Sequence, residues 1–155
     1  MRDPSKPRPG VPEASSDAAR KRMEAAKGHD TKPERRLRSH LHRLGLRFRI
    51  QRKLLHGLRR KADIVFGPAR VVVFIDGCFW HGCPEHYRAP SRNSSYWAPK
   101  VARNRARDAD TDAQLAKEGW TVLRFWEHDN ALEAAKAVAA TVLRVRVPSL
   151  TVGNV

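Results

Sequence analysis

The sequence predicts an α/β fold in which helices flank a mixed β-sheet. Stretches with apolar residues at helical spacing alternate along the chain with short apolar runs that are typical of buried strands. The expected order is a helix, three strands, a second helix, a fourth strand and a last helix, which favours helices packed against one sheet. The chain has 155 residues, enough for a single domain with one core.

The first expected helix begins at Thr31. Thr31 is suited to be the N-cap, Pro33 falls in the first turn, and Glu34 occupies the position that a capping box requires. Leucines then recur at helical spacing until Gly45, a residue type that commonly ends helices. Residues 46–50 alternate between apolar and basic side chains, which predicts a half-buried strand.

A hairpin of two buried, central strands is expected next. A basic loop over residues 51–61 leads into it. Its strands are the apolar runs 63–66 and 71–75, and residues 67–70 (GPAR) form the turn between them. Because both runs are continuously apolar, we expect both faces of the hairpin to be covered.

The second half of the chain predicts a helix, a strand and a last helix. The helix, which carries a basic face, runs from Tyr96 to about Glu118. Residues 120–126 (WTVLRFW) predict another central strand, and Asp129 is placed to cap a last helix that continues through Val142.

The two ends of the chain are expected to lie outside this domain. Residues 1–20 are rich in proline, serine and charge, which favours a disordered tail. The domain then spans residues 21–145, and residues 146–155 form a C-terminal tail. The stretch 20–28 is either a short helix or a flexible basic arm.

The charge of the chain favours a polyanionic partner. It carries 31 Lys and Arg against 16 Asp and Glu, a formal net charge of +15, and this balance is typical of proteins that bind nucleic acid. An origin in an Arg-rich lineage is the alternative explanation. No apolar run is long enough for a membrane span and no signal-peptide pattern opens the chain, so we expect a cytoplasmic protein without membrane contact.

Two cysteines and a histidine stand at metal-binding spacing after the hairpin. Cys78, Cys83 and His86 follow the pattern C-x4-C-x2-H, and in a reducing compartment such a group indicates metal ligation before a disulfide. Structural zinc takes four ligands of this kind. His128 is the best fourth candidate, because the strand before it can run beside the hairpin, and His81 is the competing ligand. Two buried structural thiols are the alternative.

Two aspartates mark one end of the expected hairpin. Asp63 opens its first strand and Asp76 ends its second, so the Asp63 carboxylate and the backbone at Ile75 meet there. Carboxylate and carbonyl oxygens are ligands that Mg²⁺ prefers. His81, with an ordinary pKa near ~6.5, is suited to deprotonate an attacking water, and Asp108 can hold its ring. Solvated strand ends and an ordinary salt bridge are the alternatives.

An aromatic pair, Phe79 and Trp80, stands between two of the expected zinc ligands. Packing against the sheet is one interpretation of the pair. The other is a wedge that stacks on bases or enters a base step of DNA, as apolar side chains of DNA-bending proteins do. A tight zinc loop has little room to bury both rings, which favours the wedge.

The segment FIDGCFWHGCPEH, residues 74–86, resembles the central motif of the very-short-patch-repair DNA mismatch endonucleases. The resemblance extends from about residue 23 to about residue 129, and long motifs in the same order make it specific. These motifs are DTKPE (30–34), ADIVF (62–66), Tyr96-Trp97, residues 104–108 and GWTVLRFWEH (119–128).

The resemblance implies a restriction-endonuclease-like α/β fold and a Mg²⁺-dependent endonuclease. Such enzymes nick one strand on the 5′ side of the thymine in a T:G mismatch, which arises when 5-methylcytosine deaminates. By position, Asp63 and the Ile75 carbonyl match the catalytic Mg²⁺ ligands, His81 the general base and Asp108 its partner. Glu34 matches an acid near the active site, although helix capping also explains it.

The resemblance also implies a structural Zn²⁺ site and an apolar DNA wedge. The zinc ligands by position are Cys78, Cys83, His86 and His128, and the DNA-contacting residues are Phe79, Trp80 and, in an N-terminal arm, Met23. The implied partner is double-stranded DNA with a T:G mismatch, bound by a monomer at the nucleoid. A companion cytosine-5 methyltransferase and mismatch-repair or repair-polymerase proteins are further implied partners.

The sequence departs from the family pattern at two positions of the expected metal site. The best-known members carry a histidine where Asp76 stands and a proline where Ala62 stands. Asp76 is therefore a second ligand, a water holder or a bystander. Cys78 occupies the place of the lysine that related nucleases carry after the second acid. Two other functions stay open: a zinc-containing DNA-binding module without catalysis, and a restriction-like nuclease without mismatch specificity.

Overall fold

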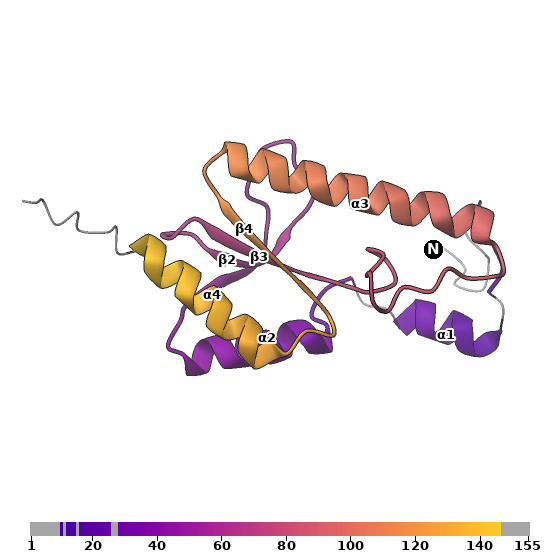
Figure 1. The fold of residues 1–155 in the computed structure, drawn as a ribbon, viewed down its shortest axis with the longest axis horizontal. Coiled ribbons are helices and arrows are strands. Elements are labelled where there is room, and N and C mark those ends of the chain that lie inside the picture. Colours follow the sequence, from indigo (N-terminus) through magenta and orange to yellow (C-terminus); the bar gives the residue numbers. More distant parts are fainter. Residues whose placement is uncertain (1–9, 11, 15, 26–27, 147–155) are drawn as a thin grey trace, which may run out of the picture.

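A computed structural model describes residues 10, 12–14, 16–25 and 28–146 of the chain (Figure 1). Its elements are, in chain order, α1 (Asp17–Ala25), α2 (Lys32–Arg43), β1 (Arg49–Arg52), β2 (Ala62–Phe66), β3 (Val71–Asp76), α3 (Ser94–Lys117), β4 (Thr121–Trp126) and α4 (Ala131–Arg146). This is the expected order with one further helix, α1, in front. The predicted α/β architecture is confirmed.

The four strands form one mixed sheet in the order β1-β2-β3-β4. The pairs β1–β2 and β2–β3 are antiparallel, whereas β3 and β4 are parallel because α3 connects them as a crossover. The predicted central hairpin is confirmed. The prediction that residues 120–126 form a central strand is wrong, since β4 lies at an edge; its apolar character reflects the helices on both faces rather than a central place.

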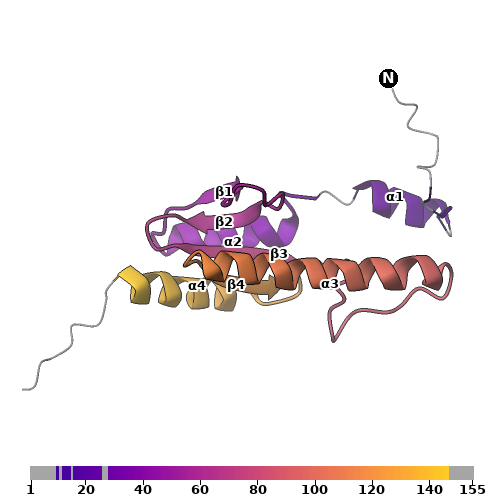
Figure 2. The ribbon, with the colours of Figure 1, turned by 90° about the horizontal axis from the view of Figure 1, so that it is seen from above.

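Helices cover both faces of the sheet. Figures 1 and 2 show α3 on one face and α2 with α4 on the other, and α1 lies apart from the sheet. The hairpin strands supply alternate residues to two cores. Ile64, Phe66 and Val73 pack toward α2 and α4, whereas Val65 and Val72 pack in the cluster that contains Leu115 of α3. This two-sided burial explains the continuous apolar runs.

Helix α2 begins and ends as its sequence predicts. Thr31 is the N-cap, and its hydroxyl accepts the N–H of Glu34 at 3.5 Å. At the other end Gly45 has a φ of +79°. The N–H of Leu46 then donates to the carbonyl of Leu41 and that of Gly45 to the carbonyl of His42, which is a Schellman motif. These caps fix where the chain leaves α2 and enters β1.

Strand β1 differs from its prediction. The alternating residues 46–50 were expected to form it, but the strand comprises Arg49–Arg52. Leu46 is buried because it closes the end of α2, so the first apolar position of the pattern belongs to the helix cap. Ile50, expected to be half-buried, is 45% exposed. Because the strand continues to Arg52, the basic loop begins two residues later than predicted.

Two predicted boundaries at the ends of the domain are also corrected. Helix α1 begins at Asp17, inside the range 1–20 that was expected to be disordered. The cap of α4 is Asn130, whose side chain accepts the N–H groups of Leu132 and Glu133, whereas Asp129 accepts the N–H of Trp126 at 2.7 Å.

The expected tail residues 147–155, and residues 1–9, 11 and 15, lie outside the described residues. Among the described residues, no helix is long and apolar enough to cross a membrane.

Candidate active site and metal centre

The Asp63 carboxylate lies at the end of the β2–β3 hairpin, as predicted. The pairing of Ile64 with Val73 brings Asp63 beside Ile75, whose N–H donates to Asp63 Oδ2 at 2.8 Å. The side-chain amide of Gln51 donates to Oδ1 at 3.1 Å. Burial raises the pKa of Asp63 to about 6, against the lowering effect of the Ile75 hydrogen bond. A buried carboxylate of this kind is a group whose charged form a bound cation stabilises.

Glu34 combines a capping role with proximity to Asp63. Its side chain is buried and accepts the N–H of Asp30 at 2.9 Å and the hydroxyl of Thr31 at 3.1 Å. The negative charge of Glu34 also helps to raise the pKa of Asp63. Both interpretations of Glu34 from the sequence are therefore compatible with its position.

The His81 ring lies between two acidic side chains. Its Nδ1 is hydrogen-bonded to Asp108 Oδ2 and lies 3.7 Å from Asp76 Oδ1. Asp108 also pairs with Arg60 at 3.0 Å. Burial acts to raise the pKa of Asp108, but the hydrogen bond to His81 and the nearby positive charges outweigh it and lower the pKa. An ionised Asp108 favours the proton on Nδ1, which leaves Nε2 of the neutral ring as a proton acceptor.

Asp76 is engaged by an arginine from the neighbouring strand. Nη1 of Arg124 donates to both oxygens of Asp76, at 2.9 and 3.0 Å, while Nε donates to both oxygens of Asp112 at 2.9 Å. Burial raises the pKa of Asp76, and the Arg124 charge opposes this rise. This pairing makes Asp76 the counter-ion of Arg124, a role that was not among the three left open by the sequence.

The four expected zinc ligands converge in space. The ligand atoms of Cys78, Cys83, His86 and His128 all lie within 4.8 Å of one another. Cys78 Sγ is 3.1 Å and Cys83 Sγ is 3.8 Å from His128 Nδ1, which is 3.2 Å from His86 Nδ1. Zinc bonds of about 2.0 Å to nitrogen and about 2.3 Å to sulfur separate ligands by roughly 3.3–3.8 Å at tetrahedral corners. The spacing and donor types fit zinc.

The competing ligand His81 does not join this group. Its ring is directed to Asp76 and Asp108 instead, and these three residues form a second cluster of metal-binding side chains. The two clusters therefore divide the histidines of one short loop between them. His128 reaches the first cluster because β4 runs parallel to β3 and ends beside it.

Contacts from α3 and from the end of β4 hold the loop after β3. Asn104 donates to the carbonyl of Trp80 at 2.8 Å, and Arg105 donates to the carbonyls of His81 and Gly82. Gly82 has a φ of +65°, and a Cβ there would lie 2.7 Å from the Arg105 side chain. The left-handed backbone favours glycine at this turn, and a side chain there would also displace the Arg105 guanidinium.

Phe79 and Trp80 are half-buried in a cluster of rings. The Phe79 centroid lies 5.2 Å from Trp80 and 5.4 Å from Trp97, and the Trp80 and Trp97 centroids are 5.7 Å apart. The Lys100 ammonium lies 5.3 Å from the centroid of the Trp80 ring. The rings thus pack against α3 and still present part of their surface. Met23 lies in α1, and its side chain is outside what the structure describes.

Sequence reasoning missed three residues that hold the site together. Gln51 contacts Asp63, Arg124 contacts Asp76, and Glu127 Oε1 accepts the N–H of Cys78 at 2.8 Å. Arg124 had a visible signal, because it is a lone charge inside an apolar strand. Gln51 stood in a presumed loop without any such signal.

Comparisons with known proteins give a consistent result. The family model described as DNA mismatch endonuclease Vsr matches residues 14–86. Type II nicking enzyme V.NaeI of Lentzea aerocolonigenes is 46% identical over 136 residues, which cover 86% of this chain and 82% of that protein. Type II nicking enzyme V.XorIIP of Xanthomonas oryzae pv. oryzae is 42% identical over 77% of this chain and 90% of its own length. DNA mismatch endonuclease Vsr of Escherichia coli is 37% identical over 69% of this chain and 67% of its own length.

The family match and the relatives identify the chain as a DNA endonuclease, a hydrolase that acts on phosphodiesters. The chain belongs to the Vsr family. The resemblance drawn from the sequence is thereby confirmed, and so is the prediction of an enzyme that acts on DNA.

Proposed function

We propose that the chain nicks one strand of double-stranded DNA on the 5′ side of the thymine in a T:G mismatch. The observation that carries this proposal is the Asp63 carboxylate at the hairpin end, in a member of the Vsr family. Asp76, which ends the partner strand, acts on the Asp63 charge and lies 3.7 Å from the ring of His81, the partner of Asp108. The mismatch preference is supported by the match to the mismatch endonuclease of Escherichia coli.

Asp63 and the Ile75 carbonyl would hold a catalytic Mg²⁺ in this proposal, because hard oxygen donors suit that ion. When bound, Mg²⁺ would stabilise the charge that develops on the phosphodiester and lower the pKa of the attacking water. His81 Nε2 accepts the proton of that water, and Asp108 stabilises the charged ring that results. Glu34 is proposed as a further acid near the metal.

Cys78, Cys83, His86 and His128 would hold a structural Zn²⁺. All four positions are protein ligands, so this ion would hold the loop in place and leave no position for a reacting water. The zinc loop carries Phe79 and Trp80, which we propose enter the base stack at the mismatch together with Met23 from the other groove. A mispaired step is easier to open, so the substrate itself contributes to the selectivity.

The wider architecture is proposed to be restriction-endonuclease-like, with a catalytic domain over residues 21–145 that acts as a monomer. A companion cytosine-5 methyltransferase would generate the 5-methylcytosine whose deamination creates the mismatch. Mismatch-repair or repair-polymerase proteins would process the nick.

The deciding experiment compares nicking of one labelled duplex with a central T:G pair and of the same duplex with C:G. The proposal expects Mg²⁺-dependent nicking of T:G, on the thymine strand, at a rate at least about 100-fold above that of C:G. Equal cutting of both duplexes would favour a restriction-like nuclease, an alternative that the relatives described as type II nicking enzymes support. Binding without cutting, across Mg²⁺ and Mn²⁺, would contradict the catalytic assignment.

A further inference from the structure

A basic groove of about 760 Å³ runs between α2 and β1. Its lining combines one face of α2 with the segment that enters and forms β1. The lining residues are Arg35, Arg38, Ser39, His42, Phe48, Arg49, Ile50, Gln51 and Arg52. Four of these nine residues are arginines and none is acidic, so the groove has a positive field.

The arginines of this groove differ in how they are engaged. Arg38 pairs with Asp30, and Arg35 lies 3.7 Å from the same carboxylate. Arg49 and Arg52 are exposed in β1, and neither guanidinium group makes a hydrogen bond or ion pair with another described residue. Two guanidinium groups are therefore available to an anion without breaking a contact of the folded protein.

The groove leads to the proposed catalytic carboxylate. Gln51 lines it and donates to Asp63 at 3.1 Å. On the other wall, Arg38 lies one helical turn after Glu34, whose charge reaches Asp63. A polyanionic chain that lies in the groove would therefore meet the catalytic end of the hairpin.

We propose that the α2–β1 groove binds the phosphodiester backbone of the DNA substrate, with Arg49 and Arg52 on successive phosphates. The proposal rests on the DNA endonuclease activity of the family. It does not depend on the proposed mismatch preference or on the proposed Mg²⁺ site. Its test is accordingly a binding measurement with a fully paired duplex in the absence of Mg²⁺.

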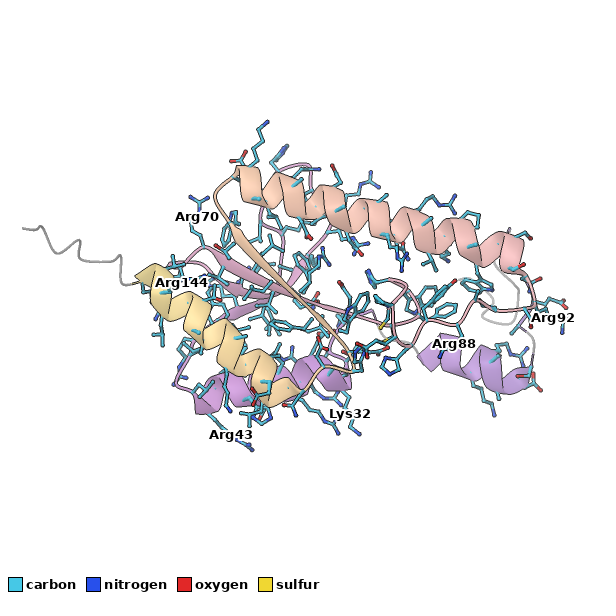
Figure 3. The ribbon with its side chains drawn as sticks, viewed as in Figure 1. Lys32, Arg43, Arg70, Arg88, Arg92 and Arg144 are labelled. Atoms are coloured by element: carbon cyan, nitrogen blue, oxygen red, sulfur yellow. The ribbon has the colours of Figure 1, made fainter. Side chains whose placement is uncertain are left out.

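The experiment compares two double variants, Arg49→Gln with Arg52→Gln and, as a matched control, Arg144→Gln with Arg146→Gln. The control pair is exposed on α4, on the opposite side of the molecule from β1 (Figures 2 and 3). Fluorescence anisotropy measures the Kd of each protein over a range of salt concentrations. Both pairs remove two charges, so general electrostatic attraction changes equally.

The groove variant should bind on the order of tenfold more weakly, and its slope of log K against log salt should fall by about 1.8, since each lost phosphate contact removes about 0.9. The control should keep the wild-type slope. An equal loss in both variants would overturn the proposal, and so would an unchanged groove variant. A melting temperature measured for each protein shows that all are folded.

A second observation concerns the backbone of Gln51. Its φ is +51°, although it lies inside β1 between the residue pairs Ile50–Ile64 and Arg52–Ala62. A side chain strains the backbone in this left-handed region, and such residues persist where other interactions fix them. The register places Gln51 opposite Asp63, whose Oδ1 accepts its side-chain amide at 3.1 Å.

We infer that Gln51 is a positioning residue that orients the Asp63 carboxylate for the metal. Ile75 fixes Oδ2 and Gln51 fixes Oδ1, so the two donors together set the plane of the carboxylate. Groups that orient metal ligands typically contribute 10–100-fold to metal affinity, so a loss of at least about tenfold is expected here. This inference rests on the proposed role of Asp63 as a Mg²⁺ ligand.

The test compares Gln51→Gly with Gln51→Ala. Both remove the amide, but only glycine adopts the left-handed backbone without strain. Both should need about tenfold more Mg²⁺ for half-maximal nicking and should show a smaller rise in melting temperature with added Ca²⁺. Gln51→Ala should melt lower than Gln51→Gly without metal. A glycine variant with wild-type Mg²⁺ and Ca²⁺ dependence would overturn the inference, because only the backbone would then matter.

Asp63→Asn separates this inference from the proposed function. It should lose the Ca²⁺-dependent rise in melting temperature completely. If it kept that rise, the assignment of Asp63 as a metal ligand would fail, and the role of Gln51 with it. If Asp63→Asn loses the rise and Gln51→Gly keeps it, only the inference about Gln51 fails.

Discussion

Replacing Asp63 with asparagine should stabilise the metal-free protein and at the same time abolish nicking. Burial raises the pKa of this carboxyl from 3.8 to about 6, so at neutral pH the folded chain holds a charge that the unfolded chain accommodates more easily. The shift is about two units at about 1.4 kcal/mol per unit, which sets an upper bound of about 3 kcal/mol. Imperfect hydrogen bonding of the asparagine reduces the expected gain to about 1–3 kcal/mol.

The size of this stability gain depends on pH. Because the pKa is raised in the folded state, the stabilising influence of the protonated carboxyl is complete below pH 3.8 and is lost as the pH rises through about 6. The gain of Asp63→Asn should therefore be full above about pH 7 and disappear as the pH falls toward 4. The measurement is urea unfolding of both proteins between pH 4 and pH 8, in buffer without Mg²⁺ and without chelator, so that bound zinc stays in place.

An asparagine variant that is less stable than the wild type at pH 7.5 would refute this reasoning, as would a gain that does not change with pH. Added Mg²⁺ provides an internal control. It should stabilise the wild type and leave Asp63→Asn unchanged, because the variant lacks the charged ligand.

Four further results are expected. His81→Ala should lower the nicking rate by at least about 100-fold without weakening DNA binding, and unchanged single-turnover rates would remove His81 as the base. Cys78→Ser should lose the zinc that elemental analysis is expected to find at about one per wild-type chain, and a metal-free wild type with normal melting would exclude the site. Gly82→Ala should lower the melting temperature by a few degrees, because its Cβ displaces Arg105; an unchanged temperature and nicking rate would show that the turn tolerates a side chain. Glu34→Gln should keep the melting temperature within about 4 °C, because glutamine also serves in a capping box, and should lower the nicking rate more than about tenfold; an unchanged nicking rate would leave Glu34 with the capping role alone.

The sequence predicted most of the fold because strong local signals coincide with buried elements. The Thr31 cap and the Gly45 stop of α2 depend on backbone groups within a few residues, and both are present. The hairpin prediction succeeded because two apolar runs flank a short turn. The edge position of β4 was not predictable from its residues, since helices cover both faces of that strand and give it a central composition.

The candidate site divides in the same way. The convergence of Cys78, Cys83 and His86 was predictable, because all three come from one short loop. Gln51 was not, because its role depends on a strand that begins three residues later than its pattern suggested and on a left-handed backbone at one position. The pairing of Asp76 with Arg124 likewise required the register between β3 and β4, which leaves no mark on either strand alone.

The sequence by itself determined the α/β class, the family, and the residue types available for two metal sites, because motifs, composition and spacing are properties of the chain. Only the tertiary structure decided which of those residues meet. Parallel pairing of β3 with β4 brings His128 to the cysteine loop and directs His81 to Asp108 instead. Packing of α2 beside β1 creates the basic groove from residues in separate elements. These choices depend on distances between segments far apart in the chain, and such distances are set when the core packs.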